Sequence, residues 1–152
     1  MIAIAAFTTQ ALATQPPPHM TPTVPGSAGD PVWQGQVRMS DGRTFVTDGG
    51  FAIDAAMTGL TTFPERVLPG KVLEDYIKAP HTDECALNEL KSTPGGRTHL
   101  TPSGVAISAT YVTYLRRVVS GRRVRLRTSG AERPVVVVSD DKAVGVLMPV
   151  KQ

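Results

Sequence analysis

Six arginines within twelve residues are the part of the sequence best suited to binding a charged partner. Residues 111–133 contain seven arginines and one acidic residue, Glu132. A cationic surface gains free energy when it releases counterions from a polyanion, so this density predicts binding to a DNA phosphate backbone without base readout. A solvated helix and strand face without a partner is the alternative interpretation. The predicted DNA-binding residues are Arg116, Arg117, Arg122, Arg123, Arg125 and Arg127.

Two histidines and the single cysteine form a second set of side chains with possible chemistry. His81, Cys85 and His99 carry groups that bind zinc, but their spacing fits no closed four-ligand pattern. A Cys–His nucleophile pair would need an oxyanion hole and an orienting third group, and no residues mark either. The glycines at 49–50 and 95–96 lack the sequence context of a phosphate-binding loop. We therefore expect no enzyme activity, no metal and no cofactor.

The clustered arginines fall on a predicted helix that is followed by three predicted strands. The helix begins after Ser108 or Thr110 and ends at Gly121, where a left-handed residue is favoured. In the first strand, Val124 and Leu126 alternate with arginines, so we expect one face to pack on the core and the other to present guanidinium groups. The apolar stripe that predicts the helix is Ala109, Val112, Leu115 and Val119. The three strands are predicted over residues 123–128, 134–140 and 143–150.

Turn residues between β-rich runs predict further strands and one more helix in the preceding part of the chain. Leu68-Pro69-Gly70 comes directly before an apolar face at helical spacing over residues 72–78, and Pro80 ends that helix. Asp-Gly turns at 41–42 and 48–50 separate three predicted strand regions, which are residues 32–39, 43–46 and 51–57. Two weaker strands are predicted near residues 85–90 and 97–101.

Composition limits the fold to one small domain with short elements. The 152 residues are 41% hydrophobic, and 14 glycines with 13 prolines leave little room for long helices. One cysteine cannot form an internal disulfide, and no apolar run reaches the roughly 18 to 20 residues that a membrane-spanning helix needs. We expect an α+β domain over residues 31–152, with antiparallel sheets and two short helices on one face. Residues 1–30 are expected to be a flexible linker or signal segment.

Three sequence matches resemble bacterial DNA polymerase sliding clamps. The last stretch has a Tyr111-to-Leu115 helix motif, a charged strand, a β-branched strand and a final Met148-Pro149 dipeptide followed by an apolar and a basic residue. Thr47-Asp48-Gly49 is similar to a Thr-Asp-Gly turn of the clamp family, and residues 67–73 are similar to the start of a clamp helix. Together these matches touch about half of the chain.

The resemblance implies a clamp-like domain without enzyme activity that acts in DNA replication. Clamp helices line a channel and face duplex DNA, and a groove on the clamp binds peptides of polymerases and repair factors. A full clamp subunit has three such domains, so this chain would encircle DNA only as a homo-oligomer or through a different assembly. The peptide-binding residues that the resemblance implies are Thr47, Gly49, Val146, Met148, Pro149 and Val150.

The N-terminal residues leave a second class of protein open. Residues 1–13 are apolar and end in Ala11-Leu12-Ala13, a possible signal-peptide cleavage site, although the segment lacks the usual initial Lys or Arg. In this interpretation residues 14–30 are a stalk, and the protein is an exported or virus-associated β-rich structural or interaction module. The DNA-associated interpretation predicts a cytoplasmic protein instead.

Overall fold

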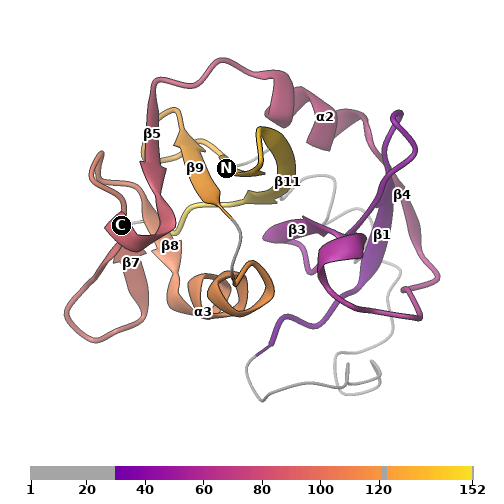
Figure 1. The fold of residues 1–152 in the computed structure, drawn as a ribbon, viewed down its shortest axis with the longest axis horizontal. Coiled ribbons are helices and arrows are strands. Elements are labelled where there is room, and N and C mark those ends of the chain that lie inside the picture. Colours follow the sequence, from indigo (N-terminus) through magenta and orange to yellow (C-terminus); the bar gives the residue numbers. More distant parts are fainter. Residues whose placement is uncertain (1–29, 121–122, 152) are drawn as a thin grey trace.

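The structure is an α+β fold, as the sequence predicts (Figure 1). It is a computed structural model that describes residues 30–120 and 123–151, so residues 1–29 of the expected N-terminal segment lie outside the described residues. The described part contains an eight-stranded sheet in the order β4–β1–β2–β3–β11–β10–β9–β5 and a three-stranded sheet in the order β6–β7–β8.

The described helices and strands are short, in agreement with the many glycines and prolines. The α-helices are α2 (Lys71–Lys78) and α3 (Ala109–Val118), and the 3-10 helices are η2 (Ala55–Met57) and η3 (Leu87–Glu89). The strands are β1 (Gly35–Arg38), β2 (Thr44–Thr47), β3 (Phe51–Asp54), β4 (Val67–Pro69), β5 (Asp83–Ala86), β6 (Lys91–Ser92), β7 (Thr98–Leu100), β8 (Ala106–Ser108), β9 (Val124–Thr128), β10 (Val135–Ser139) and β11 (Lys142–Leu147).

The C-terminal prediction of a helix followed by three strands is confirmed. Ser108 is the N-cap of α3, and β9, β10 and β11 form an antiparallel meander. The helix ends at Val118, and the predicted end at Gly121 lies outside the described residues. The helix predicted over residues 72–78 is also confirmed, because α2 begins one residue earlier and ends at Lys78. The weak strand expected near residues 85–90 is only partly correct: β5 ends at Ala86, where η3 replaces the extended chain.

The larger sheet is mixed, whereas the sequence predicted antiparallel sheets. Strand β4 runs parallel to β1, with Leu68 opposite Val37, and every other pair in the sheet is antiparallel. Strand β4 has three residues and is followed directly by α2. A strand this short gives almost no alternating pattern in the sequence.

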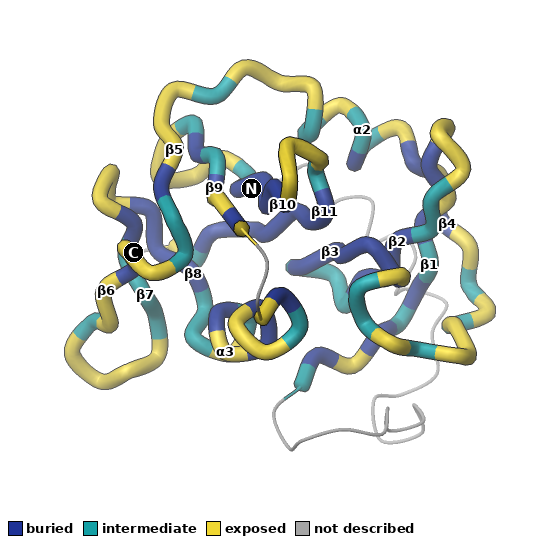
Figure 2. Tube along the Cα trace, viewed as in Figure 1, coloured by how far each residue is buried: buried dark blue, intermediate teal, exposed yellow. Residues whose placement is uncertain are grey.

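The two helices pack on opposite faces of the large sheet, and the prediction that they share one face is wrong. Phe51 and Ile53 of β3 lie in a large core cluster with Val112 and Leu115 of α3. Ala52, between them in sequence, lies in a smaller cluster covered by α2. Because successive strand residues point to opposite faces, a strand that is apolar throughout needs cover on both sides. Figure 2 shows β3 and much of β11 in the colour of buried residues between the two helices.

A β-bulge interrupts the regular alternation of side chains along β11. The register pairs Val137 with Gly145 but Val138 with Ala143, so Val144 is the extra residue on β11. As a result Val144 and Leu147 both belong to the large core cluster, although regular alternation would place them on opposite faces. Val146 belongs to the smaller cluster.

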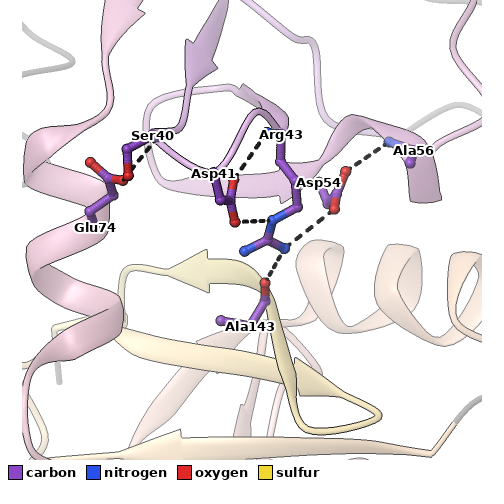
Figure 3. A network of polar contacts seen from close by, with 7 residues as sticks. All are labelled: Ser40, Asp41, Arg43, Asp54, Ala56, Glu74 and Ala143. Carbon is purple, nitrogen blue, oxygen red and sulfur yellow. Dashed lines mark hydrogen bonds and ion pairs between the residues drawn. The ribbon is translucent and has the colours of Figure 1, made fainter.

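One guanidinium group links the β1–β2 turn to the middle of the sheet. Arg43 donates to the carbonyl oxygen of Ala143 at 2.6 Å and lies 3.4 Å from a carboxylate oxygen of Asp54 and 2.8 Å from one of Asp41 (Figure 3). The same turn contacts α2, because the Glu74 carboxylate accepts hydrogen bonds from the backbone N–H and the hydroxyl of Ser40. These contacts fix α2 beside β1 and β2.

Gly70 allows β1 and the start of α2 to approach closely, and its substitution provides a test of this packing. A Cβ at position 70 would lie 2.4 Å from the carbonyl oxygen of Arg38, so either the helix or the strand must move. We expect Gly70→Ala to lower the free energy of unfolding by about 1–3 kcal/mol, measured by urea denaturation. The neighbouring exposed variant Lys71→Ala should change it by less than about 0.5 kcal/mol. Equal stability of the two variants would contradict this packing.

Candidate nucleic-acid interface

Helix α3 presents an exposed polar face because most of its apolar residues turn toward the large core cluster, while Ala109 at its start is half-buried. Val112 and Leu115 are buried, whereas Thr113, Arg116 and Arg117 are exposed. The helix has no acidic residue, and its two arginines lie in the last turn, where cations interact favourably with the helix dipole. The predicted separation of an apolar stripe from a cationic face on this helix is therefore confirmed.

The two arginines of α3 have different surroundings. A guanidinium nitrogen of Arg117 lies 2.7 Å from a carboxylate oxygen of Asp30, and its central carbon lies 5.2 Å from the ring centroid of Tyr114. Arg116 is exposed near the three-stranded sheet. Burial lowers the pKa of His99 on β7, and the positive charge of Arg116 lowers it further.

The arginines of β9 lie on another face of the protein. Val124 and Leu126 pack in the large core cluster with α3, so Arg125 and Arg127 point to the opposite side of the sheet. Their guanidinium groups lie 2.5 Å and 3.8 Å from the carboxylate of Glu84 on the neighbouring strand β5. The predicted guanidinium face of β9 is present, but its arginines are paired with an acidic residue of the neighbouring strand β5.

The six predicted arginines therefore do not form one surface. Arg116 and Arg117 lie on α3, and Arg125 and Arg127 lie across the sheet beside Glu84. Arg123 is exposed directly before β9. Arg122 lies outside the described residues.

The Thr-Asp-Gly turn and the terminal segment, which the clamp resemblance pairs, lie side by side. The backbone N–H of Met148 donates to the carbonyl oxygen of Gly50 at 2.8 Å. Thr47 is buried, and its hydroxyl accepts a hydrogen bond from the N–H of Gly49 at 3.1 Å. The N–H of Val150 donates to the carbonyl oxygen of Ala106 at 2.8 Å, which joins the chain end to the smaller sheet.

Most of the predicted peptide-binding side chains are already covered by the chain itself. Val146 and Met148 belong to the smaller core cluster with Leu73 of α2, and Met148 is only 8% exposed. Pro149 is buried, while Gly49 and Val150 are half-buried. A peptide that binds Val146 and Met148 must therefore displace part of the chain that packs on these two side chains.

An interaction that the sequence did not reveal connects the Asp48 turn to α3. The Asp48 carboxylate accepts hydrogen bonds from the N–H groups of Gly50 and Phe51, at 3.0 and 2.9 Å, and from the hydroxyl of Tyr111 at 3.2 Å. Burial raises the pKa of Asp48 despite these hydrogen bonds. Burial, together with the Asp48 charge, also raises the pKa of Tyr111. A Cβ on Gly50 would lie 2.7 Å from the Tyr111 hydroxyl, so glycine fits this position.

The cysteine and histidines that were considered for chemistry show no comparable set of contacts. Cys85 is buried, and burial raises the pKa of its thiol, which disfavours the reactive thiolate. Burial and the charge of Arg127 lower the pKa of His81. Within residues 30–120 and 123–151, no three His, Cys, Asp or Glu side chains are arranged as possible ligands of one metal ion.

Comparison with known proteins does not assign this chain to a family. No protein-family model, curated protein or solved structure matches this chain. In the part of the chain that the structure describes, no helix is both long and apolar enough to span a membrane.

The half-buried carboxylate of Asp48 predicts a specific pH dependence of stability. Its pKa is higher in the folded protein than its ordinary value of 3.8, so its contribution to stability falls as pH rises through the folded pKa. Asp48→Asn keeps an oxygen acceptor and removes the buried charge. We expect this variant to unfold at higher urea concentration than the wild type at pH 7 and to lose that advantage below pH 3.8.

Asp41→Asn is the matched control, because we expect it to change the stability at pH 7 in the opposite direction. Hydrogen bonds from the backbone N–H and then the guanidinium of Arg43 lower the pKa of Asp41, so its contribution is present above its unfolded pKa and lost in acid. This variant should be less stable than the wild type at pH 7 and equal to it in acid. If both substitutions shift stability in the same direction at pH 7, the interpretation of Asp48 is wrong.

Met148 tests whether the terminal segment is part of the core. Truncating a buried methionine removes apolar contacts and leaves a cavity, so Met148→Ala should lower the free energy of unfolding by about 2–4 kcal/mol. Val150→Ala, at a half-buried position, should cost less. Urea denaturation measures both values. A cost below about 1 kcal/mol for Met148→Ala would show that α2 does not hold this side chain.

Proposed function

We propose that the protein is a non-enzymatic, clamp-like DNA-associated protein of the cytoplasm that binds the backbone of duplex DNA through α3. The observation that carries the proposal is the exposed face of this helix, which combines Arg116 and Arg117 with Thr110 and Thr113. The helix itself has no acidic residue, and Arg117 is paired with Asp30 from outside the helix. Arginines contact phosphate oxygens by charge-assisted hydrogen bonds, and threonine hydroxyls can donate to the same oxygens.

Backbone contacts alone fit this surface better than base recognition does. The cationic face is one turn of a ten-residue helix, and two arginines with two threonines provide little of the donor and acceptor pattern that reads base edges. The aromatic residues of α3 point inward: Tyr114 is buried, and its ring packs against Trp33 and Phe51. Stacking on single-stranded bases needs exposed rings, so duplex DNA is the preferred partner.

The order of elements after α3 supports the clamp-like part of the proposal. A helix followed by an antiparallel meander that ends in Met148-Pro149 is what the resemblance to sliding clamps implies for this segment. The contact between Met148 and Gly50 supports a peptide site for polymerases or repair factors at the junction of the turn and the terminal segment. Encirclement of DNA requires several copies of a domain of this size, so the proposal includes a homo-oligomer on DNA.

A pair of charge-matched variants tests DNA binding. Arg116→Ala/Arg117→Ala removes two cations from α3, and Arg125→Ala/Arg127→Ala removes two from the opposite face. Fluorescence anisotropy with labelled duplex DNA across a salt titration gives the affinity and its salt dependence. We expect the α3 variant to bind about tenfold more weakly or worse at low salt and its logarithmic salt slope to fall by about 0.9 to 1.8, since each lost phosphate contact contributes about 0.9 and Arg117 is already paired with Asp30.

The β9 variant should keep most of the wild-type affinity because Arg125 and Arg127 lie on the other face of the sheet from α3, where both are close to the carboxylate of Glu84. Far-ultraviolet circular dichroism confirms that both variants are folded. Equal losses in the two variants would indicate a net-charge effect and not a binding face. An unchanged affinity of the α3 variant would overturn the proposal.

A further inference from the structure

Asp30 forms an ion pair with Arg117, one of the two arginines of the proposed DNA-binding face. Its carboxylate lies 2.7 Å from a guanidinium nitrogen of Arg117, and the side chains of Asp30 and Arg117 are 17% and 46% exposed. The acidic group is therefore mostly covered, while nearly half of the guanidinium surface is open to solvent. An approaching phosphate can reach Arg117, but it meets a guanidinium whose charge is already compensated.

The short segment that carries Asp30 is held against α3 by aromatic contacts. The ring of Trp33 lies 5.6 Å from the ring of Tyr114 and 5.8 Å from the ring of Phe51, and Trp33 is buried. Tyr114 also lies under the guanidinium of Arg117, on the next turn of the same helix. The position of Asp30 near Arg117 is thus supported by the packing of Trp33 three residues away, and the ion pair does not have to hold the segment by itself.

Of the two arginines of α3, Arg117 is paired with a carboxylate of the described residues and Arg116 is not. It is equally part of the exposed last turn of α3, yet among the described residues it has no carboxylate within ion-pair distance. The helix therefore presents one uncompensated arginine and one arginine whose position is fixed by a ring and an acidic group. A carboxylate and a DNA phosphate use the same guanidinium donors, so they compete.

We propose that Asp30 is an internal anion that competes with DNA phosphate for Arg117 and weakens the binding of duplex DNA. This inference rests on the proposed function of α3. In the free protein Arg117 is paired with Asp30, and in the DNA complex a phosphate replaces the carboxylate as the main partner of the guanidinium. The competition reduces both the affinity and the number of counterions that DNA releases when the protein binds.

Asp30→Asn tests the inference because asparagine has nearly the same shape and no charge. Since the Arg117 side of this ion pair is open to solvent, its net contribution is small, and we expect labelled duplex DNA to bind about two- to fivefold more tightly at low salt. The logarithmic salt slope should become steeper by up to about 0.9. The measurement is fluorescence anisotropy on the full-length protein, and Asp30→Ser provides a second neutral variant should asparagine disturb the fold.

Two controls separate a local effect from a general gain of positive charge. Asp75→Asn makes the same charge change on α2, at an exposed position on the other face of the sheet, and should improve binding less than Asp30→Asn does. In the Arg117→Ala background, Asp30→Asn should give no improvement beyond that of Asp75→Asn. Equal gains for the two acidic variants, or a full gain without Arg117, would overturn the inference.

The outcome also distinguishes this inference from the proposed function. If Arg116→Ala/Arg117→Ala weakens DNA binding and Asp30→Asn has no effect, α3 is the binding face and only the competition by Asp30 is wrong. If the double arginine variant binds duplex DNA like the wild type, the proposed function fails and the inference fails with it.

Discussion

Burial of the central strands on both faces is the constraint on which the rest of this structure depends. In β2, Phe45 belongs to the smaller core cluster and Val46 to the larger, and the same division is seen in β3 and β11. A sheet with apolar groups on both sides must be covered on both sides. Helix α2 covers one face and α3 the other, so the side chains of Val146 and Met148 and the cationic helix face lie on opposite sides of the sheet.

The position of α3 depends on rings more than on charges. Tyr111 and Tyr114 pack against Phe51, and Tyr111 also donates a hydrogen bond to the Asp48 turn. With its inner side fixed in this way, the helix must direct Arg116 and Arg117 outward. The proposed binding face is thus a consequence of core packing, and its arginines contribute little to holding the helix in place.

Local patterns predicted the helices and the C-terminal meander because each of these elements has its own apolar spacing. The alternation around Val124 and Leu126, for example, marked both the strand and its guanidinium face. What the patterns could not supply was the partner of that face, since Glu84 lies 41 residues before Arg125 and has no local signal. The same reason explains why the Asp48–Tyr111 contact and the direction of β4 were not predicted: each is set by packing between distant segments.

The bulge at Val144 makes the length of the last hairpin as important as its composition. Because side chains alternate between the two faces, a residue inserted or deleted elsewhere in β11 would turn part of the strand toward the wrong face, and deletion of Val144 itself would remove an apolar side chain from the large core cluster. Substitution of one apolar residue by another is a milder change. Evolution of this segment should therefore tolerate exchanges of side chains while rejecting one-residue insertions and deletions, a pattern that related sequences would carry in their alignment gaps.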